Sequence, residues 1–353
     1  MSGKRGVISE GENGIPILFA TGNSLAEAWE NSLLELYEHG SLAPTQYDKK
    51  GDPESRDATM TMVIEDPSSE PLIHRAFPGK LVDLNIYRLE VMEGIKDTWV
   101  RDLTNPRDDK WEYTYHERLF DYSVPLSLIQ QGIAELPPVV KEEMNKKGIQ
   151  SLLDKPWARV IQKPIRKWGF VGDDWKVVET KTEPTVVINQ IQACVEKLIE
   201  VPYGRRIQAV TWKPWEDLTA YDPACLQSLW FRILKGKLST NIRFRSRDAY
   251  KAALMNDFAF VHLHEEVARQ VSEGRGELIV PGRIEDHSDS YHIYGSYFKE
   301  FENNFLPLIN SRSFEKRTWT RAQAEGIFEE DTPTMLKEYA AKTEELRLER
   351  EKE

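Results

Sequence analysis

The segment from Arg205 to Asn256 reads RRIQAVTWKPWEDLTAYDPACLQSLWFRILKGKLSTNIRFRSRDAYKAALMN. It combines an arginine pair, one cysteine after Asp-Pro-Ala, and an Arg-Ser-x-Asp sequence that is followed by an amide. A nucleotide site uses this mixture, because a thiolate is a nucleophile, guanidinium groups bind phosphate and an amide pairs with a base. The alternating runs 229–234 and 238–245, joined through Lys235-Gly236, predict a β-hairpin between these groups.

Length, charge and cysteine content limit the class of protein. The chain has 353 residues, enough for one large domain or two, and 40% of them are hydrophobic. Its net charge of -11 argues against a nucleic-acid partner. With only two cysteines, Cys194 and Cys225, we expect a reducing compartment and no disulfide framework. The N-terminus lacks the apolar run of a signal peptide, and no stretch approaches the roughly 20 apolar residues of a membrane span. We therefore expect a cytoplasmic protein with no membrane partner.

Hydrophobic periodicity predicts an α/β (α+β) chain with a mixed, mainly antiparallel sheet and a long buried helix. Strands are expected at Ile15–Ala20, Ala58–Ile64 and Ile207–Trp212, with strands or strand ends at Glu277–Val280 and His292–Tyr297. Helices are expected at Ala26–Tyr37 with Ser24 as N-cap, at Val186–Glu200, at 248–271 with Asp248 near the cap, and in the charged segment from Pro333 to Glu353. Leu81–Met92 mixes strand and helix signals.

The domain prediction is a single catalytic domain over residues 1–330, followed by a charged helical tail over 331–353. Residues 136–185 are thin in apolar side chains. They suggest a helical piece and then irregular or short β segments. We interpret this stretch as an insertion within the domain.

The two cysteines differ in their surroundings. A lone cysteine is most often a small buried hydrophobic residue, and Cys194, on the apolar side of a predicted helix, fits that description. Cys225 follows a turn and leads into a predicted strand, with arginines near it in sequence. Positive charge close to the sulfur would favour the thiolate, so Cys225 is the candidate nucleophile.

The polar residues around Cys225 have ordinary readings as well. Arg205-Arg206 fits a solvated pair, and the alternation of Arg243, Arg245 and Arg247 is typical of a wet strand face. Arg245-Ser246 is more suggestive, since a guanidinium beside a hydroxyl binds phosphate well. Asn256 lies on an apolar helix, and its amide would suit the edge of a uracil.

Five motifs in order resemble the thymidylate synthase family, and most closely its methanogen-type branch. They are RRIQAVTW, DPACLQSLW, GKLS, RSRDAYKAALMN and DSYHIYGSYF, and they cover about residues 186–305. YTYHERLF at 113–120 is similar to an aromatic segment of the same branch. The first 80 or so residues, the 136–185 stretch and the tail do not take part.

The resemblance implies a role for each matching residue. Cys225 takes the place of the nucleophile that adds to carbon 6 of the pyrimidine, after which carbon 5 attacks a one-carbon unit. Tyr115 matches the tyrosine that helps to move the carbon 5 proton. The substrate-binding matches are Arg245 and Ser246 for the phosphate, Arg205 and Arg206 for the partner's phosphate across a dimer interface, Asp248 beside the base and folate, Asn256 for the uracil edge, and His292 and Tyr294 for the sugar hydroxyl.

Three assignments within the resemblance stay open. The catalytic glutamate is assigned to Glu90, with Glu93 second, although counting back from Gly94 puts Tyr87 in that place. Relatives that act on cytosine carry an acid where Asn256 stands, and Asp257 follows directly. Arg56, before a predicted strand, resembles a mobile-loop phosphate arginine, and a solvated loop residue fits it equally well.

The implied enzyme is a homodimer, with a sheet face as its interface, that converts dUMP and 5,10-methylenetetrahydrofolate to dTMP and dihydrofolate without a metal. Two departures matter: Leu226 follows the nucleophile where the common branch has His, and the charged tail replaces a short apolar C-terminus. A closed site excludes water, so that hydride completes the reaction, whereas a site that admits water would give a hydroxymethyl group. A 5-hydroxymethylase acting on dUMP, dCMP or CMP is therefore the alternative. A non-catalytic nucleotide- or RNA-binding relative is the third possibility.

Overall fold

The computed structural model of the chain describes residues 3–11, 14–105, 108, 110–134, 138, 142, 150–172 and 174–352. These residues form two compact units. Unit 1 consists of Met1–Met92, Val195–Gln208 and Cys225–Lys337, and unit 2 of Glu93–Cys194, Ala209–Ala224 and Glu338–Glu353. Most of the helical piece expected from residue 136 onwards lies outside the described residues. The single domain over 1–330 stays a prediction.

A mixed sheet forms the centre of unit 1. Its strands follow the order β1 (Arg5–Ser9), β2 (Ile17–Gly22), β4 (Ser55–Ile64), β13 (Val280–Ile293), β11 (Lys237–Phe244) and β10 (Leu226–Leu234). β3 (Ser41–Ala43) pairs with β4, and β12 (Arg247–Asp248) with β13. The pairs β2–β4, β11–β13 and β12–β13 are parallel, and the other pairs are antiparallel. The predicted α/β class with a mainly antiparallel sheet is thus confirmed.

The predicted hairpin is present as β10 and β11. Buried Leu238, Ile242 and Phe244 alternate with more exposed residues along β11, which gives the strand one core-facing side. Lys235 and Gly236 both have positive φ, 52° and 70°. Two consecutive left-handed residues are what a tight two-residue hairpin turn requires.

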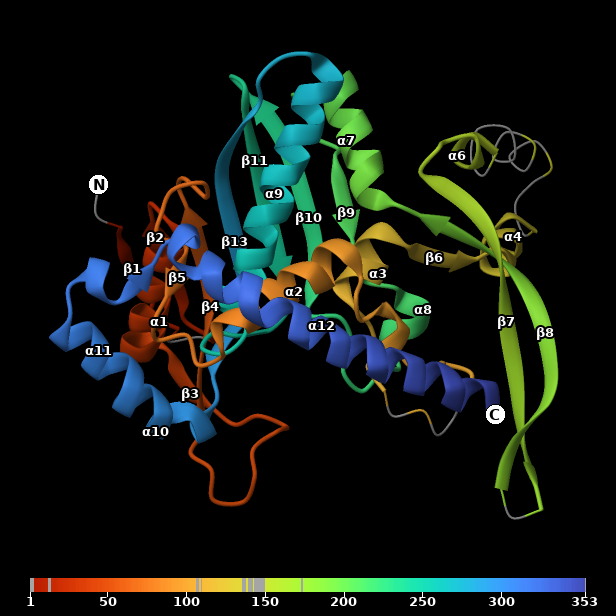
Figure 1. Cartoon of the computed structure of the whole chain (residues 1–353), viewed down its shortest axis with the longest axis horizontal. Coiled ribbons are helices and arrows are strands. Elements are labelled where there is room, and N and C mark those ends of the chain that lie inside the picture. Colours follow the sequence, from red (N-terminus) through yellow and green to blue (C-terminus); the bar gives the residue numbers. More distant parts are fainter. Residues whose placement is uncertain are drawn as a thin grey trace. The chain divides into compact units, whose positions relative to one another are not determined.

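The long buried helix is α9 (Ala253–Arg275), which lies over β11 and β13 (Figure 1). It ends at Gly276, whose left-handed φ of 66° suits a glycine. The predicted start at Asp248 was wrong, because Arg247 and Asp248 pair with β13 as a short strand. Asp248 Oδ1 accepts hydrogen bonds from the backbone of Tyr250 and Lys251, which makes a turn ahead of the helix.

The other elements of unit 1 surround this sheet. α1 (Leu25–His39) packs on β2 and β4, and Ser24 occupies its N-cap without a side-chain capping bond. Leu81–Met92 is resolved as a helix, α2 (Leu81–Glu93). Shorter elements are β5 (Ile73–His74), which pairs with β14 (Thr318–Trp319), the helical turns η3 (Gly295–Tyr297) and η5 (Phe314–Lys316), α10 (Phe298–Glu300), the π-helix η4 (Phe301–Phe305) and α11 (Leu306–Ser311).

The β segments expected after the helical piece are longer and more regular than predicted. The strands β7 (Ala158–Val171) and β8 (Asp174–Ile188) pair along their whole length and form the extended two-stranded ribbon in Figure 1. β6 (Tyr122–Pro125) pairs with β8 and completes a sheet of order β6-β8-β7 in unit 2. Val186–Ile188, predicted as the start of a helix, belong to β8, since β-branched side chains favour strands. Helix α7 (Gln190–Glu200) begins only after them.

The remaining helices of unit 2 are short, and one long helix ends in it. They are η1 (Asp97–Trp99), α3 (Tyr115–Phe120), α4 (Leu126–Ala134), α6 (Gln150–Leu153) and α8 (Pro214–Asp217), and β9 (Gln208–Val210) precedes α8. α12 (Arg321–Lys352) contains Pro333 and starts well before it, so the predicted tail is longer than expected. Of the described helices, none is both long and apolar enough to cross a bilayer.

Candidate functional site

The β10–β11 hairpin brings the cysteine and the key arginine to one place. Cys225 directly precedes β10 and Arg245 directly follows β11, so they meet at the open end of the hairpin. The Arg245 amide donates a hydrogen bond of 2.9 Å to the Cys225 carbonyl. Both side chains are half-buried, and Cys225 is not in a disulfide. Ser246, also half-buried, follows Arg245 in the connection to β12.

Pairing of β12 with β13 sets Asp248 directly opposite His292. The amide of Ala249 donates to the His292 carbonyl at 2.8 Å, which extends the pairing by one residue. Burial raises the pKa of Asp248 to about 6, against the opposing effect of the backbone hydrogen bonds from Lys251 and Tyr250. This carboxyl therefore titrates within reach of neutral pH.

Tyr294 lies near both the Asp248 carboxyl and the Cys225 thiol. Its ring meets the His292 imidazole edge to face at 4.6 Å. Burial raises the pKa of Tyr294, and the charges of Asp248 and Cys225 add to the increase. Asp248, His292 and Tyr294 therefore lie together, and Cys225 is close enough for its charge to act on Tyr294.

His292 carries a buried nitrogen that no described residue satisfies. Its Nε2 has no hydrogen-bond partner in the described part of the chain, whereas its Nδ1 lies 3.4 Å from Ser290 Oγ. Ser290 donates its one hydroxyl proton to the Asp57 carboxylate at 2.9 Å, so its oxygen can only accept from Nδ1–H. Burial also lowers the pKa of His292 to about 4, which keeps the ring neutral. Nε2 is thus a buried acceptor, suited to a ligand hydroxyl.

The amide of Asn256 sits near the start of α9 and is buried. Its Nδ2 donates a 2.6 Å hydrogen bond to the hydroxyl of Tyr87 on α2. Glu90, on the same helix, is buried, whereas Glu93 at its end is exposed. The contact of Asn256 with Tyr87 was missed from the sequence, because the two residues are 169 positions apart.

Asp257 faces away from this amide into a buried ion network. Arg247 pairs with Asp257 at 2.7 Å and with Asp286, and it donates to the Ala253 carbonyl at 2.8 Å. Burial raises the pKa of Asp257 well above its usual value, against the attraction of Arg247. The wet-face interpretation was therefore wrong for Arg247, because its guanidinium is buried. The network holds the Asp257 carboxylate, and the role of Asn256 in binding stays a prediction.

The remaining predicted arginines lie in different settings. Arg56 lies within β4, opposite Ile293, and not in a loop as expected. Its guanidinium covers the Tyr37 ring at 4.9 Å and donates to the Gly40 carbonyl at 3.3 Å. Arg205 and Arg206 are exposed, and neither forms an ion pair with any described residue. The substrate roles of all three stay predictions.

Tyr115 belongs to unit 2. It begins α3, is buried, and its ring lies 5.5 Å from that of Tyr113. The hydroxyl of Thr114 caps the helix by accepting from the Glu117 amide at 3.1 Å. The sequence-based role of Tyr115 in moving a proton stays a prediction.

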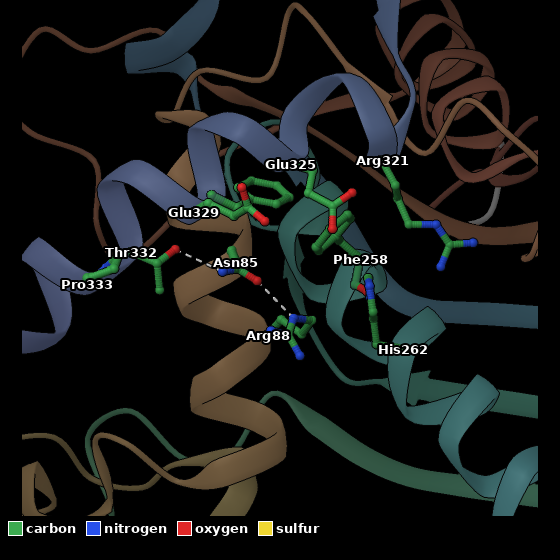
Figure 2. A pocket seen from close by; sticks show the side chains of 10 residues that line it. Asn85, Arg88, Phe258, His262, Arg321, Glu325, Glu329, Thr332 and Pro333 are labelled. Carbon is green, nitrogen blue, oxygen red and sulfur yellow. Dashed lines mark hydrogen bonds between the residues drawn. The ribbon is translucent and has the colours of Figure 1, made fainter.

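A cavity of about 440 Å³ lies elsewhere in unit 1, among α2, α9 and α12 (Figure 2). Asn85 of α2 donates a 2.9 Å hydrogen bond to Thr332 of α12, and it accepts one of 2.9 Å from Arg88 on its own helix. Phe258 and His262 of α9 also line it. None of the predicted site residues lines this cavity.

Comparisons with known proteins agree with the resemblance. The family profile described as "Thymidylate synthase" matches residues 127–312, just over half of the chain. A "Putative thymidylate synthase" of Methanothermobacter thermautotrophicus is 33% identical over 115 residues, which cover 33% of this chain and 49% of that protein. The protein of the same name from Methanocaldococcus jannaschii is 33% identical over 125 residues, covering 34% and 54%. The "Thymidylate synthase" of Listeria innocua is 28% identical over 195 residues, covering 52% and 59%.

The chain spans about half the length of the methanogen proteins that it matches. Its mixed sheet with the long buried helix α9 is the thymidylate synthase fold that the resemblance implied. The profile match includes the hairpin with Cys225 and Arg245, the first turns of α9, and the β13 segment with His292. The chain therefore belongs to the thymidylate synthase family.

Proposed function

We propose that the chain is a folate-dependent thymidylate synthase, which transfers a one-carbon unit from 5,10-methylenetetrahydrofolate to carbon 5 of dUMP. Family membership supports a methyltransferase. The observation that carries the specific proposal is the buried Nε2 of His292, which has no hydrogen-bond partner among the described residues and lies in the part of the site that also holds Tyr294, Asp248 and Cys225. An unpaired buried acceptor costs free energy, and a nucleotide sugar hydroxyl would satisfy it.

In this proposal each residue has a separate task. Arg245 and Ser246 bind the phosphate at the open end of the hairpin, and Asn256 reads the base edge. The Cys225 thiolate adds to carbon 6, which makes carbon 5 nucleophilic toward the one-carbon unit that the folate supplies. Loss of the carbon 5 proton, with Tyr115 and Glu90 proposed to handle protons, breaks the bond to the folate nitrogen and leaves an exocyclic methylene group. Hydride from tetrahydrofolate reduces that group to methyl and leaves dihydrofolate, while Cys225 is eliminated from carbon 6 to release the product. No step uses a metal.

The alternative product is a 5-hydroxymethyl pyrimidine nucleotide. It is favoured by a departure from the common branch at Leu226, which is buried directly after the nucleophile. A site that admits water would let water, in place of hydride, complete the reaction.

The test is to incubate the protein with dUMP, dCMP and CMP in turn, each with 5,10-methylenetetrahydrofolate. Methyl and hydroxymethyl products differ in mass, and only the methyl product is accompanied by the absorbance of dihydrofolate. Cys225→Ser should abolish turnover and retain nucleotide binding. Consumption of dUMP with an extra oxygen in the product would overturn the first proposal. Binding of nucleotide with no product would favour a non-catalytic relative.

We also propose a homodimer in which Arg205 and Arg206 bind the partner's phosphate. Their exposure without an acidic partner among the described residues supports this role. Co-folding Cys225→Ser chains with Arg205→Ala/Arg206→Ala chains tests it, because each mixed dimer would hold one intact site. Random mixing would then restore about a quarter of wild-type activity. Failure of the mixture to regain activity would contradict the exchange.

A further inference from the structure

We infer that Tyr87 is the positioning residue that orients the base-reading amide of Asn256. The inference rests on the proposed function and adds a residue that the sequence motifs do not assign to binding. Tyr87 lies on α2, and Asn256 lies at the start of α9. Their side chains are joined by a hydrogen bond from Nδ2 to the phenol oxygen at 2.6 Å.

The backbone of Asn256 is held by contacts within α9 and by the ion pair of the next residue. The backbone N–H of Asn256 donates to the Ala252 carbonyl at 2.8 Å, and the next residue, Asp257, is paired with buried Arg247 at 2.7 Å. Arg247 also donates to the Ala253 carbonyl, within the same turn. These contacts fix where the side chain starts, but they leave its amide free to rotate about the last torsion. The bond to Tyr87 restricts that rotation.

The hydrogen-bonding capacity of the amide shows what remains for a ligand. A primary amide has two N–H donors and a carbonyl acceptor, and Tyr87 occupies one of the donors. No described residue bonds to the second N–H or to Oδ1, so one donor and one acceptor of the amide remain for a ligand. The uracil edge presents the complementary pair, an acceptor at O4 and a donor at N3. An amide held in this orientation before the nucleotide arrives loses less conformational entropy on binding.

Tyr87 acts through Asn256 in this scheme, so its loss should affect recognition of the base only. Isothermal titration with dUMP and with 2-deoxyribose 5-phosphate separates the base from the sugar and phosphate. For Tyr87→Phe we expect dUMP to bind about five- to tenfold more weakly, the effect of one neutral hydrogen bond. Binding of 2-deoxyribose 5-phosphate should not change, because Arg245, Ser246 and His292 are untouched.

A double-mutant cycle tests the coupling directly. If Tyr87 works through the amide, Tyr87→Phe should cost little further dUMP affinity once Asn256 is Ala. Tyr122→Phe is the matched control, since it removes a tyrosine hydroxyl that donates 2.9 Å to the Trp212 carbonyl in unit 2. It should match Tyr87→Phe in melting temperature change and leave dUMP binding intact.

The outcomes separate the inference from the proposed function. Equal weakening of both ligands by Tyr87→Phe, additive losses in the cycle, or unchanged dUMP binding would each overturn the role of Tyr87 and leave the proposed function standing. A wild-type protein that binds none of dUMP, dCMP and CMP would overturn the proposed function and this inference together. If Tyr87→Phe does not fold, Tyr87→His takes its place, because it retains a hydrogen-bonding ring. Tyr87→His should bind dUMP more weakly than wild type and bind 2-deoxyribose 5-phosphate as well as wild type.

Discussion

Asp248 lies directly opposite His292 in the parallel pairing of β12 with β13, and burial shifts the two pKa values in opposite directions. It raises the pKa of Asp248 to about 6 and lowers the pKa of His292 to about 4. At neutral pH the pair therefore consists of a carboxylate and a neutral imidazole. The carboxylate can accept hydrogen bonds from a ligand, and so can Nε2 of the imidazole.

The first prediction concerns the stability that depends on Asp248. Its pKa is about 6 in the folded state and near 3.8 in the unfolded chain, so the folded state binds more protons between these values. The free energy of unfolding due to this group should fall as pH rises through that window. Urea denaturation should show that the free energy of unfolding of wild type, relative to that of Asp248→Asn, decreases as pH rises. A difference that stays constant with pH would contradict the raised pKa.

His292 should show the opposite slope. Its pKa is about 4 in the folded state and near 6.5 in the unfolded chain, so the unfolded state binds the extra proton. The contribution of the neutral ring is therefore present above about pH 6.5 and is lost as pH falls toward 4. The stability of wild type relative to His292→Gln should increase with pH over this range. The same urea experiment measures it, and a decrease would refute the prediction.

Removing the buried charge of Arg247 is expected to reduce the free energy of unfolding strongly. Replacing it with Met leaves Asp257 and Asp286 buried without their counter-ion, which should reduce the free energy of unfolding by about 3–5 kcal/mol. Arg243→Met is the control on the neighbouring strand, where the ion pair to Asp289 is exposed. The control should change stability by no more than about 1 kcal/mol. Similar losses for both variants would contradict the importance of burial.

The two cysteines should differ in reactivity toward iodoacetamide. Cys225 is half-buried at the hairpin end, whereas Cys194 is buried on α7. Peptide mass analysis should find Cys225 alkylated first, since access and thiolate character govern the rate. Added dUMP should slow labelling of Cys225 and not of Cys194. Faster labelling of Cys194 would place the reactive thiol elsewhere.

The end of α12 should loosen in unit 2 when Trp99 is replaced. The Trp99 indole donates 3.0 Å to Thr343 Oγ1, its ring meets Tyr339 at 5.1 Å, and Lys342 lies 4.4 Å above it. Trp99→Ala should increase hydrogen exchange of the amides in 338–349, because local contacts set local stability. Thr343→Val removes only the hydrogen bond and should give a smaller increase. Unchanged exchange would mean that Trp99 does not hold this helix.

Local patterns correctly predicted much of the frame. The alternation of 58–64, the hairpin at Lys235-Gly236 and most of helix α9 can be read from the sequence because their periods and turn residues are local. The same patterns failed over 158–188. There, most residues on both faces of β7 and β8 are exposed, and hydrophobic and charged side chains occur on both, so no clean alternation marks these strands.

The motif order by itself determined the family and the candidate residues, because residue types and their spacing are properties of the chain. Only the tertiary structure decided which of these side chains meet. Strand pairing set Asp248 opposite His292, burial turned Arg247 into the centre of an ion network, and helix packing joined Tyr87 to Asn256. Such contacts depend on segments far apart in sequence, and burial changes the charge and hydrogen bonding that each group can sustain.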